Sequence, residues 1–189
     1  MLIGAAVFSR PLVPASLIAA FVGGLAPDLP MLGMVLWSTR ITGVPEHEVF
    51  GKLYFSADWQ AVFAVDHSLF LWSILLAAAL WSGSIVLRSF FGSGLLHALV
   101  DFLTHHDDAR QQLWPLSDWV FRSPVSYWDS RYYGDVFGIF ELGLVITLTI
   151  YLFWRMQFWW QRAMVLAVSA ILVLPFVLTG SLHSLHGMG

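Results

Sequence analysis

Three polar side chains at helical spacing lie within an apolar stretch of the sequence. His97, Asp101 and His105 are each four residues apart in the segment LLHALVDFLTHHDD. On an α-helix, residues i and i+4 lie on one face, about 6 Å apart along the axis, so this segment presents imidazole, carboxylate and imidazole on one stripe. A histidine and an aspartate inside an apolar span are costly unless they are paired or ligated. That cost is the physical reason to predict a site here.

Two other segments place polar residues where the threading of the chain brings them to the same membrane face. Asp28 follows the first apolar stretch in GGLAPDLP, and Asp66 and His67 precede a long apolar stretch in AVDHSLFLW. The chain has no cysteine, so a metal must be held by histidines and carboxylates. These groups suit one or two divalent ions, with zinc as the first choice and manganese as the second. The predicted ligands are Asp28, His67, His97 and Asp101, with His105 as a weaker candidate.

Asp66 and Asp108 complete the predicted chemistry, which is hydrolysis. A divalent ion would acidify a water molecule toward neutral pH and make it a nucleophile. Asp66 or Asp108 would then act as the base or would orient a ligand. Taken singly, these acids have simpler interpretations, because Asp66 could cap a helix and Asp28 could form a turn after a proline. The convergence of three separate segments at one membrane level favours a metal site.

The composition indicates which elements position these groups. The 189 residues are 58% hydrophobic and only 11% charged, and the mean hydropathy is +0.74. Soluble domains average about 45–50% apolar and about 25% charged residues, so this chain lacks the charge to cover a soluble fold. We therefore predict an all-α, polytopic integral membrane protein with a single domain over residues 1–189. The net charge of −3, without a basic run, excludes nucleic acid as a partner and leaves membrane lipids.

Apolar segments of about 20 residues predict four to five membrane-spanning helices. We expect a tight turn near residues 82–88 and a kink at Pro175 in the last span. Segments 31–42 and 49–65 are rich in Trp, Phe and Tyr, and they predict amphipathic helices at the membrane interface. The predicted spans are residues 11–27, 68–87, 89–104, 136–154 and 163–182.

Basic residues in short loops predict the orientation. Arg155 and Arg162 lie in the loop RMQFWWQR, which has no acid, and the threading places Arg10 and Arg88 on the same side. Short loops rich in Lys and Arg stay in the cytoplasm. We therefore expect the predicted metal site at the opposite membrane face. A site at that level suggests a lipid-linked or amphiphilic ester or phosphoester as the substrate.

The same residues resemble the pattern of a known family. PDL at Asp28, DHS at His67, and HxxxD at His97 and Asp101, followed by a threonine and LWPL, resemble the YdjM-type family of inner-membrane proteins. Members of that family are described as metal-dependent hydrolases. The resemblance covers residues 24–128, and its most specific part is HxxxD with the following Thr and LWP. It implies a bacterial inner-membrane location and metal-dependent hydrolysis.

The sequence departs from the family pattern at three points. Pro30 stands where the family has the second acid of PDxD, and His67 is the only histidine left of HRGxTHS. The Thr-His that precedes the first apolar run in the family has no counterpart here. Either the site has one ligand fewer or an upstream segment ends in that histidine. Such a histidine would reach the site only if residues 1–9 run back toward Asp28.

Two alternatives to a hydrolase stay open at the level of sequence. The first is a non-catalytic membrane protein whose His/Asp cluster binds a structural metal or pairs helices. An open coordination position would separate an enzyme from this alternative, because structural zinc is fully ligated. The second is a proton- or metal-coupled transporter, which fits less well because Glu141 is the only acid near the middle of a predicted span.

Overall fold

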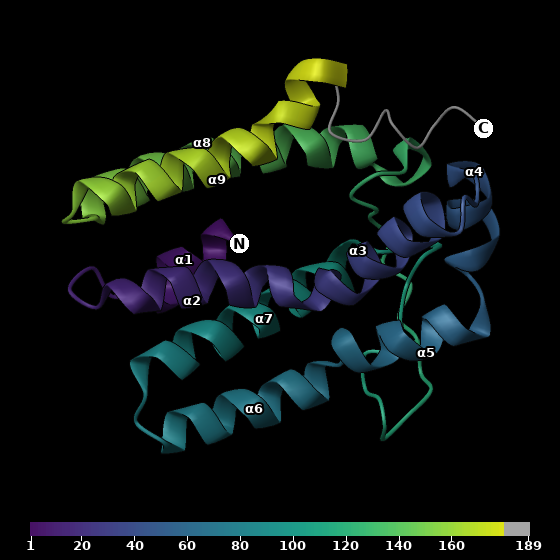
Figure 1. Ribbon diagram of the computed structural model, residues 1–189, viewed down its shortest axis with the longest axis horizontal. Helices are drawn as coiled ribbons and strands as arrows, with labels where there is room; N and C mark the ends of the chain where they lie inside the picture. Colours follow the sequence, from purple (N-terminus) through teal and green to yellow (C-terminus); the bar gives the residue numbers. More distant parts are fainter. Residues whose placement is uncertain (180–189) are drawn as a thin grey trace.

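The chain folds into a bundle of helices whose axes run roughly side by side (Figure 1). The computed structural model describes residues 1–179, and within them the chain forms helices and no β-sheet. Four helical stretches are long and apolar enough to cross a membrane, and these are Pro14–Ile41, Ala57–Trp81, Ile85–Thr104 and Gly134–Arg155. The all-α polytopic prediction is confirmed.

Helix α7 (Ile85–Thr104) is the central helix of the bundle. Small residues let its neighbours approach closely, as is common between membrane helices. A methyl group added to Gly23 would lie 2.1 Å from the carbonyl oxygen of Phe90, so the backbones of α2 and α7 nearly touch there. The helices that contact α7 include α1 (Leu2–Phe8), α2 (Pro14–Leu25) and α6 (Leu69–Trp81).

The predicted span 11–27 and the predicted amphipathic helix 31–42 form one helical stretch instead of two separate elements. Pro27 and Pro30 fall in the first positions of a new helical turn, where a missing N–H costs nothing. The prolines therefore interrupt the helix without ending it, and Asp28 lies in the tight turn at the interruption. The elements of this stretch after α2 are η1 (Ala26–Asp28), α3 (Leu29–Leu36) and η2 (Trp37–Ile41).

A second interruption separates α5 (Ala57–Asp66) from α6. Ser68 begins α6, because its Oγ accepts a hydrogen bond of 3.1 Å from the backbone N–H of Leu71. The prediction of one span over 68–87 is wrong at its C-terminal end, since α6 ends at Trp81 and α7 begins at Ile85. The expected tight turn lies between them, at Gly83, which has a φ of +71°. Two short elements precede α5, namely α4 (Glu46–Glu48) and η3 (Val49–Leu53).

Helices α8 (Gly134–Arg155) and α9 (Trp159–Thr179) form an antiparallel pair that packs on α1 (Figure 1). Helix α9 continues through Pro175, and its last turns bend away from α8 (Figure 1). The predicted span 163–182 therefore agrees with α9 as far as Thr179, and its last three residues lie outside the described residues.

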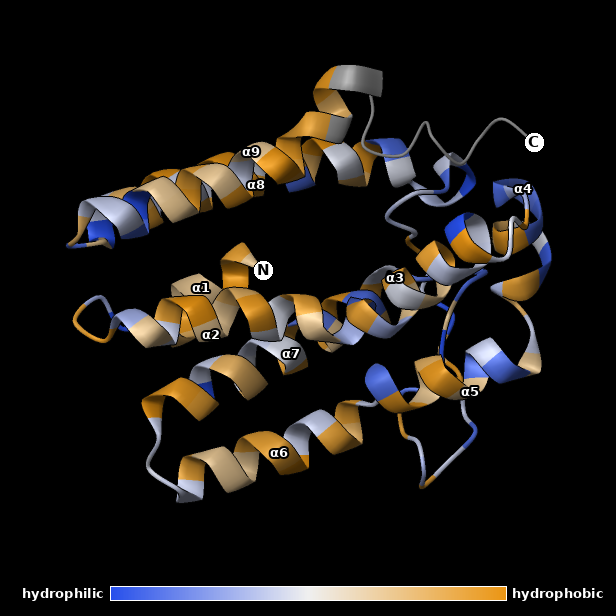
Figure 2. Ribbon diagram, viewed as in Figure 1, coloured by the Kyte–Doolittle hydropathy of each residue, from blue (hydrophilic) through white to orange (hydrophobic). Residues whose placement is uncertain are grey.

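Three short connections, α1–α2, α6–α7 and α8–α9, lie at one end of the bundle, on the left of Figure 1. We call them the basic turns, because Arg10, Arg88, Arg155 and Arg162 lie in them or beside them. Arg155 ties two of these turns together by donating to the carbonyls of Ala6 and Ser9, the latter at 2.7 Å. Gln161 adds a hydrogen bond of 3.0 Å to the carbonyl of Pro11. Figure 2 shows apolar helices, with much of the hydrophilic chain at the opposite end, around α4 and the segment after α7.

Two apolar cores support this arrangement. The larger lies between α1, α2, α8 and α9 and includes the fully buried Leu17 and Leu152. The smaller lies at the hydrophilic end, where Val49, Tyr54 and Phe63 pack with side chains of α3. The smaller core borders the predicted site, so it fixes the helices that carry Asp28 and His67.

Candidate metal centre

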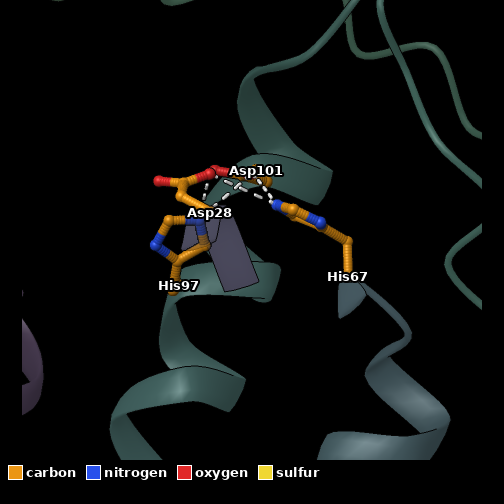
Figure 3. Close-up of side chains that lie close together, drawn as sticks. All are labelled: Asp28, His67, His97 and Asp101. Carbon is orange, nitrogen blue, oxygen red and sulfur yellow. Dashed lines mark ion pairs between the residues drawn. The ribbon is translucent and has the colours of Figure 1, made fainter. Parts of the chain in front are cut away.

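Four of the predicted site residues converge at the two helix interruptions and on α7. Asp28 comes from η1, His67 from the junction of α5 and α6, and His97 and Asp101 from successive turns of α7 (Figure 3). One ligand atom from each residue lies within 4.8 Å of the other three. The expected convergence is confirmed, and binding of a metal by these residues stays a prediction.

Four of the six separations among these atoms, those between a nitrogen and an oxygen, suit a tetrahedral ion. The Nε2 atom of His67 lies 3.6 Å from Asp28 Oδ1 and 3.2 Å from Asp101 Oδ2. The Nε2 atom of His97 lies 3.5 Å and 3.4 Å from the same two oxygens. Ligand atoms about 2.0–2.2 Å from a tetrahedral ion are separated from one another by about 3.3–3.6 Å. The nitrogen–oxygen distances therefore match, or nearly match, the edges of such a tetrahedron.

The two imidazoles are also prepared for an ion by their hydrogen bonds. His97 donates from Nδ1 to the carbonyl of Gly24 at 2.8 Å, and His67 Nδ1 contacts a carboxylate oxygen of Asp66. A ring that donates from Nδ1 keeps the lone pair of Nε2 for a metal. Both Nε2 atoms are buried and have no hydrogen-bond partner. Buried polar atoms without a partner are rare and costly, so the donor set fits a bound divalent ion.

The charge around these atoms also favours a cation. The carboxylates of Asp28, Asp66, Asp101 and Asp108 lie close together, and Arg110 is the only lysine or arginine of residues 1–179 that pairs with any of them. Buried like charges are costly unless they are compensated. His105, whose pKa is raised to about 9, supplies one further positive charge, and a divalent cation would compensate the remaining two negative charges.

His105 lies beside the group of four but outside it. Its Nε2 atom is 3.5 Å from Asp101 Oδ2, and its Nδ1 atom is 2.8 Å from Asp108 Oδ2. Burial lowers the pKa of His105, but the two carboxylates outweigh burial and raise this pKa to about 9. Burial raises the pKa of Asp108, and the neighbouring His105 outweighs burial and lowers it. The ring is therefore held between two acids, as a neighbour of Asp101.

Asp66 and Asp108 occupy equivalent places, because each carboxylate contacts the Nδ1 atom of an imidazole. Asp66 is anchored through its backbone carbonyl, which accepts a hydrogen bond of 2.7 Å from the indole of Trp72. Asp108 accepts a hydrogen bond of 3.2 Å from the indole of Trp128. Of the two roles expected for these acids, this geometry favours orientation of an imidazole over general-base catalysis.

Arg110 and Tyr54 belong to the same cluster and were not identified from the sequence. Arg110 Nη1 donates to Asp101 Oδ2 at 3.3 Å, and Nη2 donates to the Tyr54 hydroxyl at 3.0 Å. Burial raises the pKa of Tyr54, although Arg110 opposes this, so the phenol keeps its proton at neutral pH. Arg110 follows the run HHDD after α7, which is typical of a solvated helix end. Only contacts between distant segments identify it as part of the cluster.

A small cavity adjoins two of the four side chains, His67 and Asp101. Its polar wall consists of His67, Asp101, His105, Arg110 and Gln112, and Ala98 and Phe102 close its apolar side. The carboxylates of Asp28 and Asp101 keep 29% and 20% of their surface exposed. The cavity has the volume of about one water molecule, about 10 Å³, and the two carboxylates can be reached from solvent.

The first helix runs back toward the cluster. Helix α1 is antiparallel to α2, and Met1 contacts Gly24, the residue whose carbonyl accepts from His97. This is the geometric condition that a preceding histidine would need in order to reach the site, and both alternatives, such a histidine or a site with one ligand fewer, stay open.

Comparison with protein-family models, curated proteins and solved structures found no match to this chain.

Proposed function

We propose that this chain is a membrane-embedded, metal-dependent hydrolase that acts on a lipid-linked or amphiphilic ester or phosphoester. One observation carries the proposal. Two carboxylate oxygens and two imidazole nitrogens without a hydrogen-bond partner lie within 4.8 Å of one another, beside a cavity. A divalent ion bound there, zinc as the first choice and manganese as the second, supplies a Lewis acid and activates water for attack.

The residues of the chain have separate parts in this proposal. Asp28 and Asp101 provide anionic oxygen ligands, and His67 and His97 provide neutral nitrogen ligands. The contact with Asp66 keeps the His67 ring in its orientation, as carboxylates do behind many zinc-bound histidines.

The level of the site in the bundle supports an amphiphilic substrate. Helix α6 has 13 residues and begins two residues after His67, so the site lies about 20 Å from the end with the basic turns. The hydrocarbon core of a bilayer is about 30 Å thick. With the basic turns at the cytoplasmic boundary of a bacterial inner membrane, the site lies about 10 Å below the opposite boundary of the hydrocarbon core. A substrate that reaches it must itself enter the bilayer, as an amphiphile does. The resemblance to the YdjM-type family supports the same location.

A structural metal site is the alternative, because four protein ligands can complete a tetrahedral zinc site. The exposed fractions of Asp28 and Asp101 and the adjoining cavity favour the hydrolase. A fully ligated structural ion would need neither feature. A hydrolase would lose its turnover when the metal is removed, whereas a protein with a structural metal site would show no metal-dependent turnover at all.

The test combines metal content with hydrolysis. Purified protein should carry about one equivalent of zinc or manganese, and His97→Ala should lose most of it. Loss of a direct ligand weakens metal binding more than loss of a residue that only orients a ligand, which costs about 10–100-fold. His106→Ala is the matched control, since this neighbouring ring stacks on Tyr132 with ring centroids 3.6 Å apart, away from the four ligands. A chelator should abolish hydrolysis of p-nitrophenyl phosphate or p-nitrophenyl butyrate, and zinc should restore it.

Each failure has its own meaning. A wild-type protein without metal, or equal metal content in His97→Ala and His106→Ala, would overturn the metal centre. Metal that depends on His97, combined with no chelator-sensitive hydrolysis of either probe, would favour the structural site.

A further inference from the structure

We infer that Arg110 forms an oxyanion subsite beside the metal centre that binds the phosphate group of the substrate. The inference rests on the proposed function and narrows its substrate from an ester or a phosphoester to a phosphoester. It starts from a guanidinium that is held inside the protein with part of its hydrogen-bonding capacity unused.

Arg110 is one of the most buried charged side chains of the described residues, with 5% of its surface exposed. A guanidinium carries five N–H donors. One N–H of Nη1 binds Asp101 and one of Nη2 binds Tyr54, while Nε is buried and has no hydrogen-bond partner. A buried cation with a free donor costs free energy unless a ligand completes it.

The surroundings of Arg110 fix the guanidinium before any ligand binds. Its Cζ atom lies 4.9 Å from the centroid of the Phe63 ring, and the hydrogen bonds to Tyr54 and Asp101 hold its plane. Phe63 is fully buried, so the guanidinium has a rigid support. Donors that are held in place bind an anion without a further ordering cost.

The cavity places this guanidinium next to the metal ligands. Arg110 lines the cavity together with His67 and Asp101, and the cavity volume of about 10 Å³ is the space of about one water molecule. A single phosphate oxygen bound there can face both the ion and the guanidinium. Gln112 lines the same cavity, and its side-chain oxygen already accepts from the N–H of Phe121 at 3.3 Å. This leaves the amide nitrogen of Gln112 as a second donor. The donors match a phosphate, which presents several anionic oxygens at once.

A carboxylic ester would use this arrangement poorly. Its carbonyl oxygen is neutral before attack, and one metal ion can polarise it alone. A phosphomonoester or phosphodiester spreads its negative charge over two or three non-bridging oxygens, so at least one charged oxygen besides the one that faces the metal needs a cationic partner. Among the residues that line this cavity, Arg110 is the arginine that can be this partner.

Calorimetry on the full-length, zinc-loaded protein in a phosphate-free maltoside detergent tests the inference. Two phosphate probes are titrated, namely inorganic phosphate and short-chain phosphatidic acid, with acetate as the carboxylate comparison. We expect phosphate binding in the wild type and about tenfold or greater weakening in Arg110→Gln, as for loss of a charge-assisted hydrogen bond. Arg122→Gln is the matched control, because it removes the same charge from an exposed position in the same loop segment.

Arg110→Lys covers the case in which Arg110→Gln does not fold, since it keeps the charge beside Asp101 and lacks the guanidinium fork. It should also bind phosphate more weakly than the wild type, with unchanged zinc content. Tighter binding of phosphatidic acid than of inorganic phosphate would identify a lipid headgroup as the source of the phosphate, and the reverse would identify a free phosphate group.

Three results would overturn the inference. They are equal phosphate affinity in the wild type and the Arg110 variants, acetate binding as tight as phosphate binding, and loss of zinc in both Arg110 variants, which would make Arg110 a positioning residue for Asp101. Zinc content separates these failures from failure of the proposed function, because a wild-type protein that binds no zinc fails at the metal centre itself.

Discussion

At the residue scale, each histidine of the candidate metal centre has one ring nitrogen held by the protein and the other without a hydrogen-bond partner. His97 uses Nδ1 to donate to a backbone carbonyl, whereas His67 uses Nδ1 to contact the side chain of Asp66. The backbone partner cannot be removed by substitution. The contact with Asp66 can, so it offers a direct test of how orientation contributes to metal affinity.

We expect Asp66→Asn to weaken zinc binding by about 10–100-fold, the range seen for partners behind metal-bound histidines. The amide keeps the shape of the side chain but removes the negative charge behind the His67 ring. Asp58→Asn is the control, because this acid is exposed on the same helix, α5. Competition with a zinc-sensitive dye measures both affinities, and equal weakening in the two variants would show that Asp66 acts only through overall charge.

Residue spacing predicted part of the site and missed another part, for a physical reason. His97 and Asp101 follow from the i, i+4 geometry of a helix, and threading through the membrane brought Asp28 and His67 to the same level. Arg110 joins the cluster from a loop, through contacts with side chains from other elements. No local pattern encodes such contacts.

At the scale of elements, two interrupted helices deliver the ligands that α7 does not carry. Asp28 lies in the turn between α2 and α3, and His67 lies in the turn between α5 and α6. Interrupted membrane helices are tolerated where they line a functional site, because the freed backbone groups find partners there. The carbonyl of Gly24, which accepts from His97, is close to the first interruption.

The sequence predicted that helices exist in these regions but not how they join. Proline residues at 27 and 30 are compatible with the end of a helix or with the first turn of the next. The structure has the second arrangement, so two expected elements became one stretch. The central position of α7 depends in turn on small residues that pack against distant helices, and periodicity alone does not identify them.

We expect Gly23→Ala to lower both the melting temperature and the zinc affinity of the purified protein. The added methyl group would lie 2.1 Å from the Phe90 carbonyl oxygen, so α2 must move away from α7. Overpacking of this kind costs about 1–3 kcal/mol, and the shift carries Gly24 away from His97. Gly33→Ala is the control in α3, where nothing lies within 4 Å of the new methyl group. Equal melting temperatures and zinc affinities in the two variants would contradict this account.

At the scale of the whole molecule, the bundle has two unlike ends. The basic turns meet at one end, where Arg155 and Gln161 bind backbone carbonyls of the turn between α1 and α2. The hydrophilic end holds α4 and the segment after α7, and the junctions α2–α3 and α5–α6, which carry Asp28 and His67, lie between the two ends (Figures 1 and 2). Because the basic turns are short, their charge predicts that they stay in the cytoplasm. We then expect the candidate metal centre to lie nearer the opposite compartment.

This orientation can be tested directly because the chain has no cysteine, so a single introduced thiol reports its own position. Phe158→Cys lies in the α8–α9 turn and Trp119→Cys in the segment after α7, at side chains that are 44% and 50% exposed. In intact bacterial cells, a membrane-impermeant maleimide should label Trp119→Cys at once and Phe158→Cys only after permeabilisation. The opposite pattern would place the metal centre on the cytoplasmic side. The substrate would then have to come from the cytoplasmic leaflet, although the ligand geometry and the subsite at Arg110 would be unchanged.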